Sequence, residues 1–297
     1  MQFDPTLYVI TDSTYHTTET LLHAVDEACR GGATLIQLRE KDTGGRSYLE
    51  LAQQVKSVTD RYSVPLIIDD RVDVAIACDA AGVHVGASDL PVAVCRRLLG
   101  PDKIVGATAK TVEAAVAAYN DGADYLGTGA IYPTTTHVTT KVTPVSVLND
   151  VCRAVPIPVV AIGGLNADNM DVLADSPIKG IAVVSAVMKA DDPCAAAAHI
   201  KEKFLKMMNQ YGKSSETCVS ELSFCRSVVW LDRVIVDLVS AFEHLAVHGD
   251  EHCGCAARLR ERVDQCVDLE RFTGGAGGAD RLAEGGIHVE RERAVLE

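Results

Sequence analysis

The sequence predicts an α/β fold, a (β/α)8 TIM barrel with an additional C-terminal segment. Between residue 7 and about residue 210, short apolar runs alternate with amphipathic stretches, a pattern typical of βα units around a parallel sheet. Eight such units fit in this length, which favours a closed barrel over an open doubly wound sheet with fewer strands. The sequence also lacks the glycine fingerprint of dinucleotide-binding sheets.

The predicted strands are apolar runs of three or four residues, and the predicted helices are the longer stretches between them. Strands are expected at Leu7–Ile10, Leu35–Leu38, Leu66–Ile68, Gly82–Val85, Ile104–Gly106, Tyr125–Gly127, Val159–Ile162 and Ile181–Val184. Helices are expected near Thr18–Arg30, Arg46–Tyr62, Asp73–Asp79, Pro91–Leu99, Val112–Asn120, Val145–Val155, Ala167–Ala174 and Pro193–Met208. Glycines at several joints from helix to strand permit the left-handed C-cap that turns the chain back.

The composition changes after Gly212. All ten prolines and ten of the eleven lysines lie in the first 212 residues, whereas the remainder holds one Lys, nine Arg and no Pro. We therefore expect a barrel domain over residues 1–212 and a C-terminal extension over residues 213–297, helical or partly disordered. Two hypotheses fit this extension: a helical element for homo-oligomerisation, or an appended sequence without an evolved function.

Composition and charge restrict the class of protein. The chain is 47% hydrophobic and 23% charged, and no apolar stretch approaches the roughly 20 uncharged residues that cross a bilayer, so we expect a soluble cytoplasmic protein without a membrane partner. A net charge of −13 argues against nucleic acid as a partner. The ten cysteines lack paired spacings and indicate reduced thiols more than a disulfide framework.

Three polar side chains alternate at the end of the second predicted strand. Gln37, Arg39 and Lys41 should point the same way because a strand has a period of two. Two cations and an amide at the C-terminal end of a strand could hold a pyrophosphate. The alternative is a strand end whose cations pair with nearby carboxylates.

Carboxylates follow the next two strands. Asp69 and Asp70 come after the third strand, and Asp89 lies just beyond the fourth. Such a group suits a Mg²⁺ ion shared with the phosphates of a substrate, because this ion prefers oxygen ligands and keeps open positions for them. The alternative is ordinary capping: Asp89 could cap the helix that starts near Pro91, and Asp69 or Asp70 could pair with Arg71.

A long loop rich in glycine and threonine follows the sixth strand. It contains Thr134, Thr136 and His137 and ends at Lys141. Glycines allow backbone amides to approach an anion, and a run of hydroxyls with a cation at its end could fold over that anion as a lid. A solvated loop without function is the alternative, although the length of this one favours function.

The remaining candidates lie after strands five, seven and eight. Gly163–Gly164 and Val184–Ser185 follow the last two strands, where barrels often bind a phosphate monoester through backbone amides. Thr108 ends the fifth strand and aims a hydroxyl at the same mouth, although a structural hydrogen bond would also explain it. His84, inside the fourth strand, could be a satisfied interior histidine or a ligand contact.

Seven motifs in this order resemble those of thiamine phosphate synthases. The resemblance covers residues 5–210 and rests on segments 8–12, 37–41, 69–73, 82–89, 132–136, 161–164 and 183–186. It implies an enzyme that joins 4-amino-2-methyl-5-hydroxymethylpyrimidine diphosphate to 4-methyl-5-hydroxyethylthiazole phosphate and releases pyrophosphate. Small-molecule substrates and a Mg²⁺ cofactor are implied in the same way.

The resemblance also assigns roles to residues. Asp70 and Asp89 would hold the metal, and Arg39, Lys41 and Thr108 would be catalytic. Substrates would be bound by Gln37, Arg39, Lys41, Asp69, Thr108, Thr134, Thr136, His137, Lys141, Gly164, Val184 and Ser185. Among these, Gln37, Arg39 and Lys41 would grip the pyrimidine diphosphate, and the amides of Gly164, Val184 and Ser185 would bind the thiazole phosphate.

Three residues depart from the family pattern, and Ala87, in place of a usual Gln, is one of them. Asp69 stands where these enzymes usually have Asn, and His137 stands where they have Lys; Lys141 could supply the missing cation. One rival is a thiazole tautomerase, a barrel that transfers a proton with a His and needs neither a metal nor a pyrophosphate clamp. The other is a non-catalytic barrel that binds thiazole phosphate or thiamine phosphate.

Overall fold

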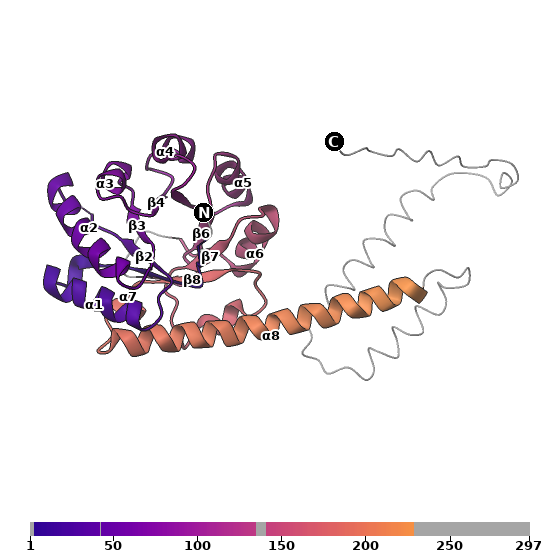
Figure 1. The fold of residues 1–297 in the computed structure, drawn as a ribbon. Coiled ribbons are helices and arrows are strands. Elements are labelled where there is room, and N and C mark those ends of the chain that lie inside the picture. The colour runs from indigo at the N-terminus through magenta and orange to yellow at the C-terminus, as the bar shows by residue number, and fades with distance from the viewer. Residues whose placement is uncertain (1–2, 42, 135–140, 229–297) are drawn as a thin grey trace, which may run out of the picture. The chain divides into compact units, whose positions relative to one another are not determined.

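Eight parallel strands close into one barrel in chain order, and the helices lie outside it (Figure 1). The computed structural model describes residues 3–41, 43–134 and 141–228, with side chains described to residue 210. The strands are β1 (Leu7–Ile10), β2 (Leu35–Leu38), β3 (Leu66–Asp69), β4 (Gly82–Val85), β5 (Ile104–Thr108), β6 (Tyr125–Gly129), β7 (Val159–Ile162) and β8 (Gly180–Val183). The predicted TIM barrel is therefore confirmed.

The helices follow the strands in the expected alternation. They are α1 (Thr18–Arg30), α2 (Gly45–Asp60), α3 (Val72–Ala77), α4 (Val92–Leu99), α5 (Val112–Asn120), α6 (Val145–Ala154), α7 (Ser185–Met188) and α8 (Pro193–Val228), with 3-10 turns η1 (Ser13–Tyr15) and η2 (Met170–Leu173). Helix α1 begins with a capping box, in which Thr17 and Thr20 each accept the other's backbone N–H, and this accounts for its predicted start. None of the described helices is long and apolar enough to cross a membrane.

The strands bury side chains on both faces. One core fills the space between the strands and the helices. A second, smaller core fills the barrel interior and consists of Tyr8, Ile10, Leu35, Ile67, Ile104, Tyr125, Val160 and Ala182. The interior is thus packed, as expected for an eight-stranded barrel, and ligands must bind at an end of it.

A glycine makes room for the largest interior side chain. In the barrel register His84 pairs with Gly106, and Gly106 pairs with Tyr125 on the next strand. A Cβ at position 106 would lie only 2.1 Å from Cζ of Tyr125. Because Gly106 has no side chain, the phenol of Tyr125 crosses in front of it and reaches His84.

The predicted helix at Ala167–Ala174 is wrong, because only the 3-10 turn η2 forms there. Oδ1 of Asn166 accepts hydrogen bonds from the amides of Asp168 and Asn169, at 2.8 and 3.1 Å. Oδ1 of Asn169 accepts in turn from the amide of Asn166, at 2.9 Å. These local bonds compete with helical ones, which is why asparagines favour turns.

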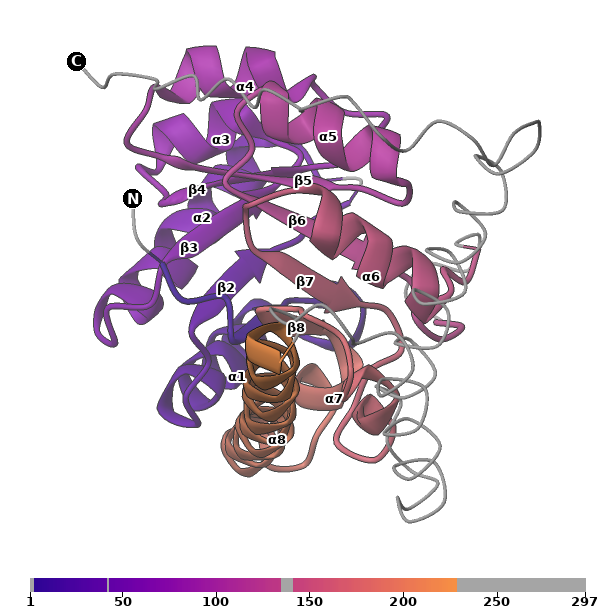
Figure 2. The same ribbon diagram turned by 90° about the vertical axis from the view of Figure 1, so that its right-hand side faces the viewer.

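Helix α8 packs against the outside of the barrel beside β8 (Figure 2). Its residues Ile200, Phe204 and Met207 are buried in the outer core. Nζ of Lys201 donates to the carbonyl of Gly32 at 2.9 Å, at the end of α1. The helix was predicted to end near Met208, but it continues to Val228 and passes the composition change after Gly212 without a break.

Candidate active site

Two cations meet a buried carboxylate at the C-terminal mouth of the barrel. Nε of Arg39 lies 3.9 Å from Oδ2 of Asp69, and Nζ of Lys41 lies 3.0 Å from the same oxygen. Lys41 also forms an ion pair with Asp70. The predicted convergence of Arg39 and Lys41 is therefore present, in the form of the salt-bridged strand end that was the alternative interpretation.

Asp69 is the most perturbed of these carboxylates. Its residue surface is only 8% exposed. Burial and the neighbouring Asp70 carboxylate raise the pKa of Asp69 to about 6, although Lys41 and Arg39 lower it. Negative charge is thus crowded at this mouth, a situation that a bound cation would relieve.

Asp70 and Asp89 sit on neighbouring loops after β3 and β4. Asp70 has a left-handed backbone with φ +59°, and its amide donates to the carbonyl of His84 at 2.9 Å. Oδ2 of Asp89 accepts from the amide of Gly86 at 2.7 Å. Burial raises the pKa of Asp89, and the Asp70 carboxylate raises it further, so Asp70 lies close enough to act on Asp89.

This pair fits a magnesium ion. Two carboxylates that repel each other supply hard oxygen ligands and leave most of an octahedral shell to water and phosphate oxygens. The capping alternatives are not what the structure shows. Arg71 pairs with Asp73 at 2.6 Å, and α4 begins at its cap residue Pro91 without a side-chain cap.

A hydrogen-bond chain crosses the barrel interior beneath the mouth. Gln37 is 3% exposed, and its Nε2 donates to the Tyr8 hydroxyl at 2.7 Å. The hydroxyls of Tyr8 and Tyr125 are 2.8 Å apart, and that of Tyr125 lies 3.0 Å from Nδ1 of His84. Nε2 of His84 lies 3.0 Å from Oγ1 of Thr108. Burial lowers the pKa of His84 to about 4, so the ring is neutral.

The sequence analysis named Gln37, His84 and Thr108, three members of the hydrogen-bond chain, and missed its two tyrosines. Tyr8 and Tyr125 lie in apolar runs and read as ordinary core residues. They belong to β1 and β6, which are not neighbours in the barrel, so no spacing along the chain connects them. The inward-facing Gly106 was the available signal, because glycine inside a strand indicates a close approach of another group.

The loop after β7 forms a compact turn against the loop after β6. Gly163 and Gly164 have φ of +102° and +66°. The carbonyl of Gly163 accepts from the amide of Tyr132 at 3.0 Å, and a Cβ on Gly164 would lie 2.7 Å from Cβ of Tyr132. Two glycines are therefore needed for the sharp turn and for its close packing.

Backbone amides are available after β7 and after β8. Among the described residues, those of Gly164, Val184 and Ser185 donate to no oxygen. Two of the three lie at the start of α7, where positive partial charge gathers. The arrangement can hold an anion such as a phosphate monoester.

The threonine-rich loop is described only in part. Thr134 is half-buried and Lys141 is exposed. Thr136 and His137 lie outside the described residues, as does the C-terminal extension beyond residue 228. The proposed roles of these two loop residues stay predictions.

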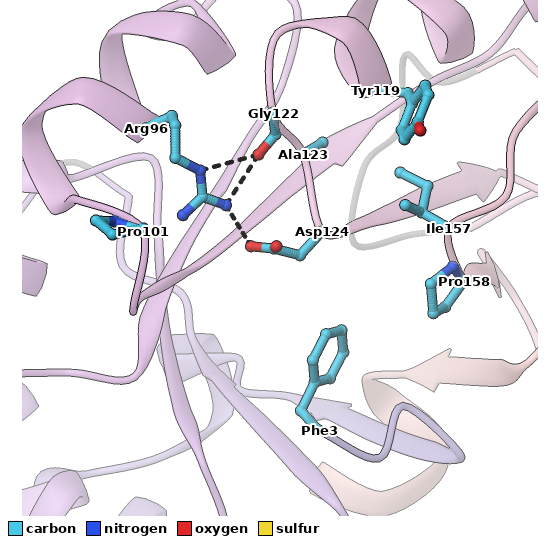
Figure 3. Close-up of a pocket in the computed structure, with 9 residues that line it drawn as sticks. All are labelled: Phe3, Arg96, Pro101, Tyr119, Gly122, Ala123, Asp124, Ile157 and Pro158. Atoms are coloured by element: carbon cyan, nitrogen blue, oxygen red, sulfur yellow. Dashed lines mark hydrogen bonds and ion pairs between the residues drawn. The ribbon is translucent and has the colours of Figure 1, made fainter. Parts of the chain in front are cut away.

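A pocket of about 580 Å³ lies at the other end of the barrel (Figure 3). Its lining residues precede strands β1, β5, β6 and β7: Phe3, Arg96, Pro101, Tyr119, Gly122, Ala123, Asp124, Ile157 and Pro158. The guanidinium of Arg96 is occupied by the carbonyls of Gly122, Gly100 and Lys103 and by the carboxylate of Asp124. This arginine therefore braces the closed end of the barrel and is not a free anion site.

Comparison with known proteins identifies the family. A profile described as thiamine monophosphate synthase matches residues 7–187. The chain is 53% identical to thiamine-phosphate synthase 2 of Streptococcus pneumoniae over 186 residues, which is 63% of this chain and 89% of the relative. It is 45% identical to thiamine-phosphate synthase of Clostridium beijerinckii over 206 residues, which is 69% of this chain and 99% of the relative.

Solved structures agree. Thiamine phosphate pyrophosphorylase from Pyrococcus furiosus superposes with a TM-score of 0.63 at 38% identity, over 68% of this chain and 96% of that one. In this chain the polar residues of the candidate site lie at the C-terminal mouth of the barrel. The chain belongs to the thiamine monophosphate synthase family.

Proposed function

We propose that this protein is a thiamine phosphate synthase, which joins the pyrimidine diphosphate to the thiazole phosphate and releases pyrophosphate. One observation carries the proposal: Arg39, Lys41, Asp69, Asp70 and Asp89 meet at one mouth of the barrel. Cations and metal-ligating carboxylates at a single site suit a diphosphate leaving group. The relatives named above share this activity in their names.

The chemistry asks the protein for charge stabilisation and positioning. Breaking the bond from carbon to pyrophosphate leaves a pyrimidine methylene cation, which its amino-substituted ring stabilises, and the thiazole nitrogen then attacks that carbon. No covalent nucleophile is needed. Asp70 and Asp89 would hold Mg²⁺, and the ion, when bound, neutralises charge that grows on the departing pyrophosphate.

Arg39 and Lys41 would stabilise the same departing charge. In the structure both cations face Asp69, so the incoming diphosphate must compete with a carboxylate for them. A diphosphate carries more negative charge than one carboxylate and offers more acceptor oxygens, so the exchange favours the substrate. The fixed positions of both cations mean that little reorganisation is needed when charge develops.

The remaining assignments place the second substrate and the lid. The amides of Gly164, Val184 and Ser185 would bind the thiazole phosphate, which orients the thiazole nitrogen toward the pyrimidine carbon. Gln37 and Thr108 would contact the pyrimidine substrate from the strand ends. Thr134, Thr136, His137 and Lys141 would contact the pyrophosphate as it leaves.

The test supplies both substrates, with Mg²⁺ or with EDTA, and measures thiamine phosphate and pyrophosphate together. We expect both products in equal amounts, and only when the metal is present. Isomerisation of a thiazole substrate without the pyrimidine would instead indicate a tautomerase. Binding of thiazole phosphate without any turnover would indicate a non-catalytic barrel.

A further inference from the structure

The hydrogen-bond chain inside the barrel begins at a group that can only donate. The amide nitrogen of Gln37 has hydrogens and no lone pair to share, so the Tyr8 oxygen must accept from it. The hydrogen of the Tyr8 hydroxyl is then free to point to the next oxygen in the chain. That next oxygen is the hydroxyl of Tyr125, at 2.8 Å.

The direction passes from group to group. Among the described residues the buried Tyr8 hydroxyl contacts no other acceptor, so it donates to Tyr125, and the hydrogen of Tyr125 in turn points to Nδ1 of His84 at 3.0 Å. Nδ1 must then be the acceptor nitrogen of the imidazole, and the ring proton sits on Nε2. Nε2 faces Oγ1 of Thr108 at 3.0 Å and donates to it.

Thr108 stands at the end of the chain and at the mouth of the barrel. Its oxygen accepts from His84, so its hydroxyl hydrogen has no acceptor within the chain. Thr108 is the last residue of β5 and is half-buried, whereas Tyr8 and Tyr125 are almost fully buried. The Thr108 hydroxyl is thus the one member of the hydrogen-bond chain that stands at the end of the barrel where the candidate site lies, with its hydrogen left to donate there.

We propose that Tyr8 and Tyr125 are positioning residues: they fix His84 as the Nε2–H tautomer, so that Thr108 donates a hydrogen bond to an acceptor on the bound pyrimidine diphosphate. The acceptor would be a ring nitrogen or an oxygen of the diphosphate. The identity of this substrate rests on the proposed function, whereas the tautomer does not.

The side chains and glycines around the hydrogen-bond chain leave room for its rings. Gly106 leaves space that the Tyr125 ring occupies, and a Cβ on Gly127 would lie 3.3 Å from Cε1 of His84. The rings of Tyr8 and Tyr125 meet edge to face with centroids 5.8 Å apart. Burial also raises the pKa of both phenols, which keeps their hydrogens in place as donors.

The tautomer can be read by NMR on the whole protein without any substrate. With ¹⁵N-labelled histidine, the two ring nitrogens of His84 should give the separate shifts of a protonated Nε2 and an unprotonated Nδ1. A His84→Asn variant identifies the signals by their loss. A protonated Nδ1, or equal populations of both tautomers, would overturn the proposal.

Two variants test whether the tyrosines set this state. Tyr8→Phe removes the donor to Tyr125, and Tyr125→Phe removes the donor to His84. In each we expect the shifts of the two nitrogens to move toward each other as both tautomers become populated. Unchanged shifts in either variant, with the protein folded by circular dichroism, would show that the chain does not set the tautomer.

Tyr48→Phe is the matched control. The Tyr48 hydroxyl is also buried, 2.7 Å from the carbonyl oxygen of Leu38 and 3.2 Å from that of Asp69, but it lies in the outer core and contacts no member of the hydrogen-bond chain. It should lose stability as the other two variants do and leave the His84 shifts unchanged. If Tyr48→Phe moved them equally, a general loss of packing would explain the result and the proposal would fail.

Turnover supplies the second readout. Tyr125→Phe should lower kcat about tenfold, the effect of one hydrogen bond, with KM changed much less. Thr108→Ser should retain most of the activity, and Thr108→Val should lose it to a similar extent as Tyr125→Phe. If Thr108→Val kept full kcat, donation from this hydroxyl would be excluded. Failure of the wild-type protein to make thiamine phosphate would instead refute the proposed function and leave the tautomer result standing.

Discussion

Asp69 holds Arg39 and Lys41 in place at the candidate site. The carboxylate lies 3.0 Å from Nζ of Lys41 and 3.9 Å from Nε of Arg39. It thereby keeps both long side chains at the mouth of the barrel, where the diphosphate is proposed to bind. Because the site already orders these cations, less side-chain entropy is lost when the substrate arrives.

Replacing Arg39 tests the use of these cations. Arg39→Ala should lower kcat/KM for the pyrimidine diphosphate about a hundredfold or more, since it removes a fixed positive charge from the leaving group. Circular dichroism should show an unchanged fold. Arg61→Ala, which breaks an exposed ion pair with Asp26, should leave turnover unchanged and serves as the control. Normal turnover by Arg39→Ala would remove this residue from the mechanism.

Asp69 should make stability depend on pH. Its pKa is about 6 in the folded protein and about 4 when unfolded, so the folded state binds the proton more tightly. The stabilisation from this proton is complete below about pH 4 and is lost as the pH rises to about 6. Relative to wild type, metal-free Asp69→Asn should gain about 1–3 kcal/mol across this window.

Urea unfolding in EDTA at a series of pH values measures this difference. Asp73→Asn is the control: the ion pair with Arg71 lowers the pKa of Asp73, so the pH dependence of Asp73 falls below about pH 4, and the difference between Asp73→Asn and wild type should stay nearly constant from pH 5 to 7. A constant difference between Asp69→Asn and wild type from pH 4 to 7 would refute the raised pKa.

The individual polar residues of the mouth were predictable where their position follows from one strand. Alternation placed Arg39 and Lys41 together, and strand ends placed Asp70 near Asp89. The interior chain was not predictable, because Tyr8 and Tyr125 meet across the closed barrel and their hydroxyls give no signal in an apolar run. The partners of Arg39 and Lys41 also depended on side-chain geometry that spacing does not fix.

Among the elements, the turn after β7 is the most constrained. Gly163 and Gly164 both have positive φ, and the loop after β6 packs directly against them. The turn therefore fixes the loop after β7 against the loop after β6. The first is proposed to bind the thiazole phosphate, and the second belongs to the proposed lid. A change at one glycine should affect both.

Gly164→Ala tests this coupling. The new Cβ would lie 2.7 Å from Cβ of Tyr132 and 2.9 Å from the carbonyl oxygen of Pro133. We expect a loss of about 1–3 kcal/mol in stability and about a tenfold higher KM for thiazole phosphate. Gly100→Ala has a similar positive φ, +79°, but no atom within 4 Å of the new Cβ, so it should cost stability without changing KM. Equal KM values for the two variants would refute the role of the turn.

The strands were more predictable than the helices between them. Each predicted strand overlaps the observed one to within two residues at either end, because a buried parallel strand is a short continuous apolar run. The segment at 167–174 failed because the side chains of Asn166 and Asn169 bind local backbone amides, an effect that hydrophobic spacing does not register. Helix α7 is only four residues long and offers too little periodicity to detect.

For the whole molecule, the length of the barrel domain can be tested by truncation. We propose that residues 1–212 suffice for activity, because 206 residues of this chain match 99% of the Clostridium beijerinckii relative. A chain that ends at Gly212 should keep wild-type kcat and an unchanged state of association by light scattering. Lost activity, or a different number of subunits per particle, would instead indicate that the extension contributes to function or to oligomerisation.

A shorter chain that ends at Ala198 provides the contrast. It lacks Ile200, Phe204 and Met207, which are buried against the barrel. Their loss removes on the order of 5 kcal/mol of hydrophobic stabilisation, comparable with the whole stability of a domain. We expect this chain to be unfolded by circular dichroism.

The aromatic cluster inside the barrel has a consequence for how ligands reach the candidate site. The Tyr125 ring lies between the rings of Phe3 and Tyr8, with centroids 5.5 Å from Phe3 and 5.8 Å from Tyr8. These three rings fill the barrel interior. The proposed substrates would then enter, and the products leave, at the same C-terminal mouth of the barrel.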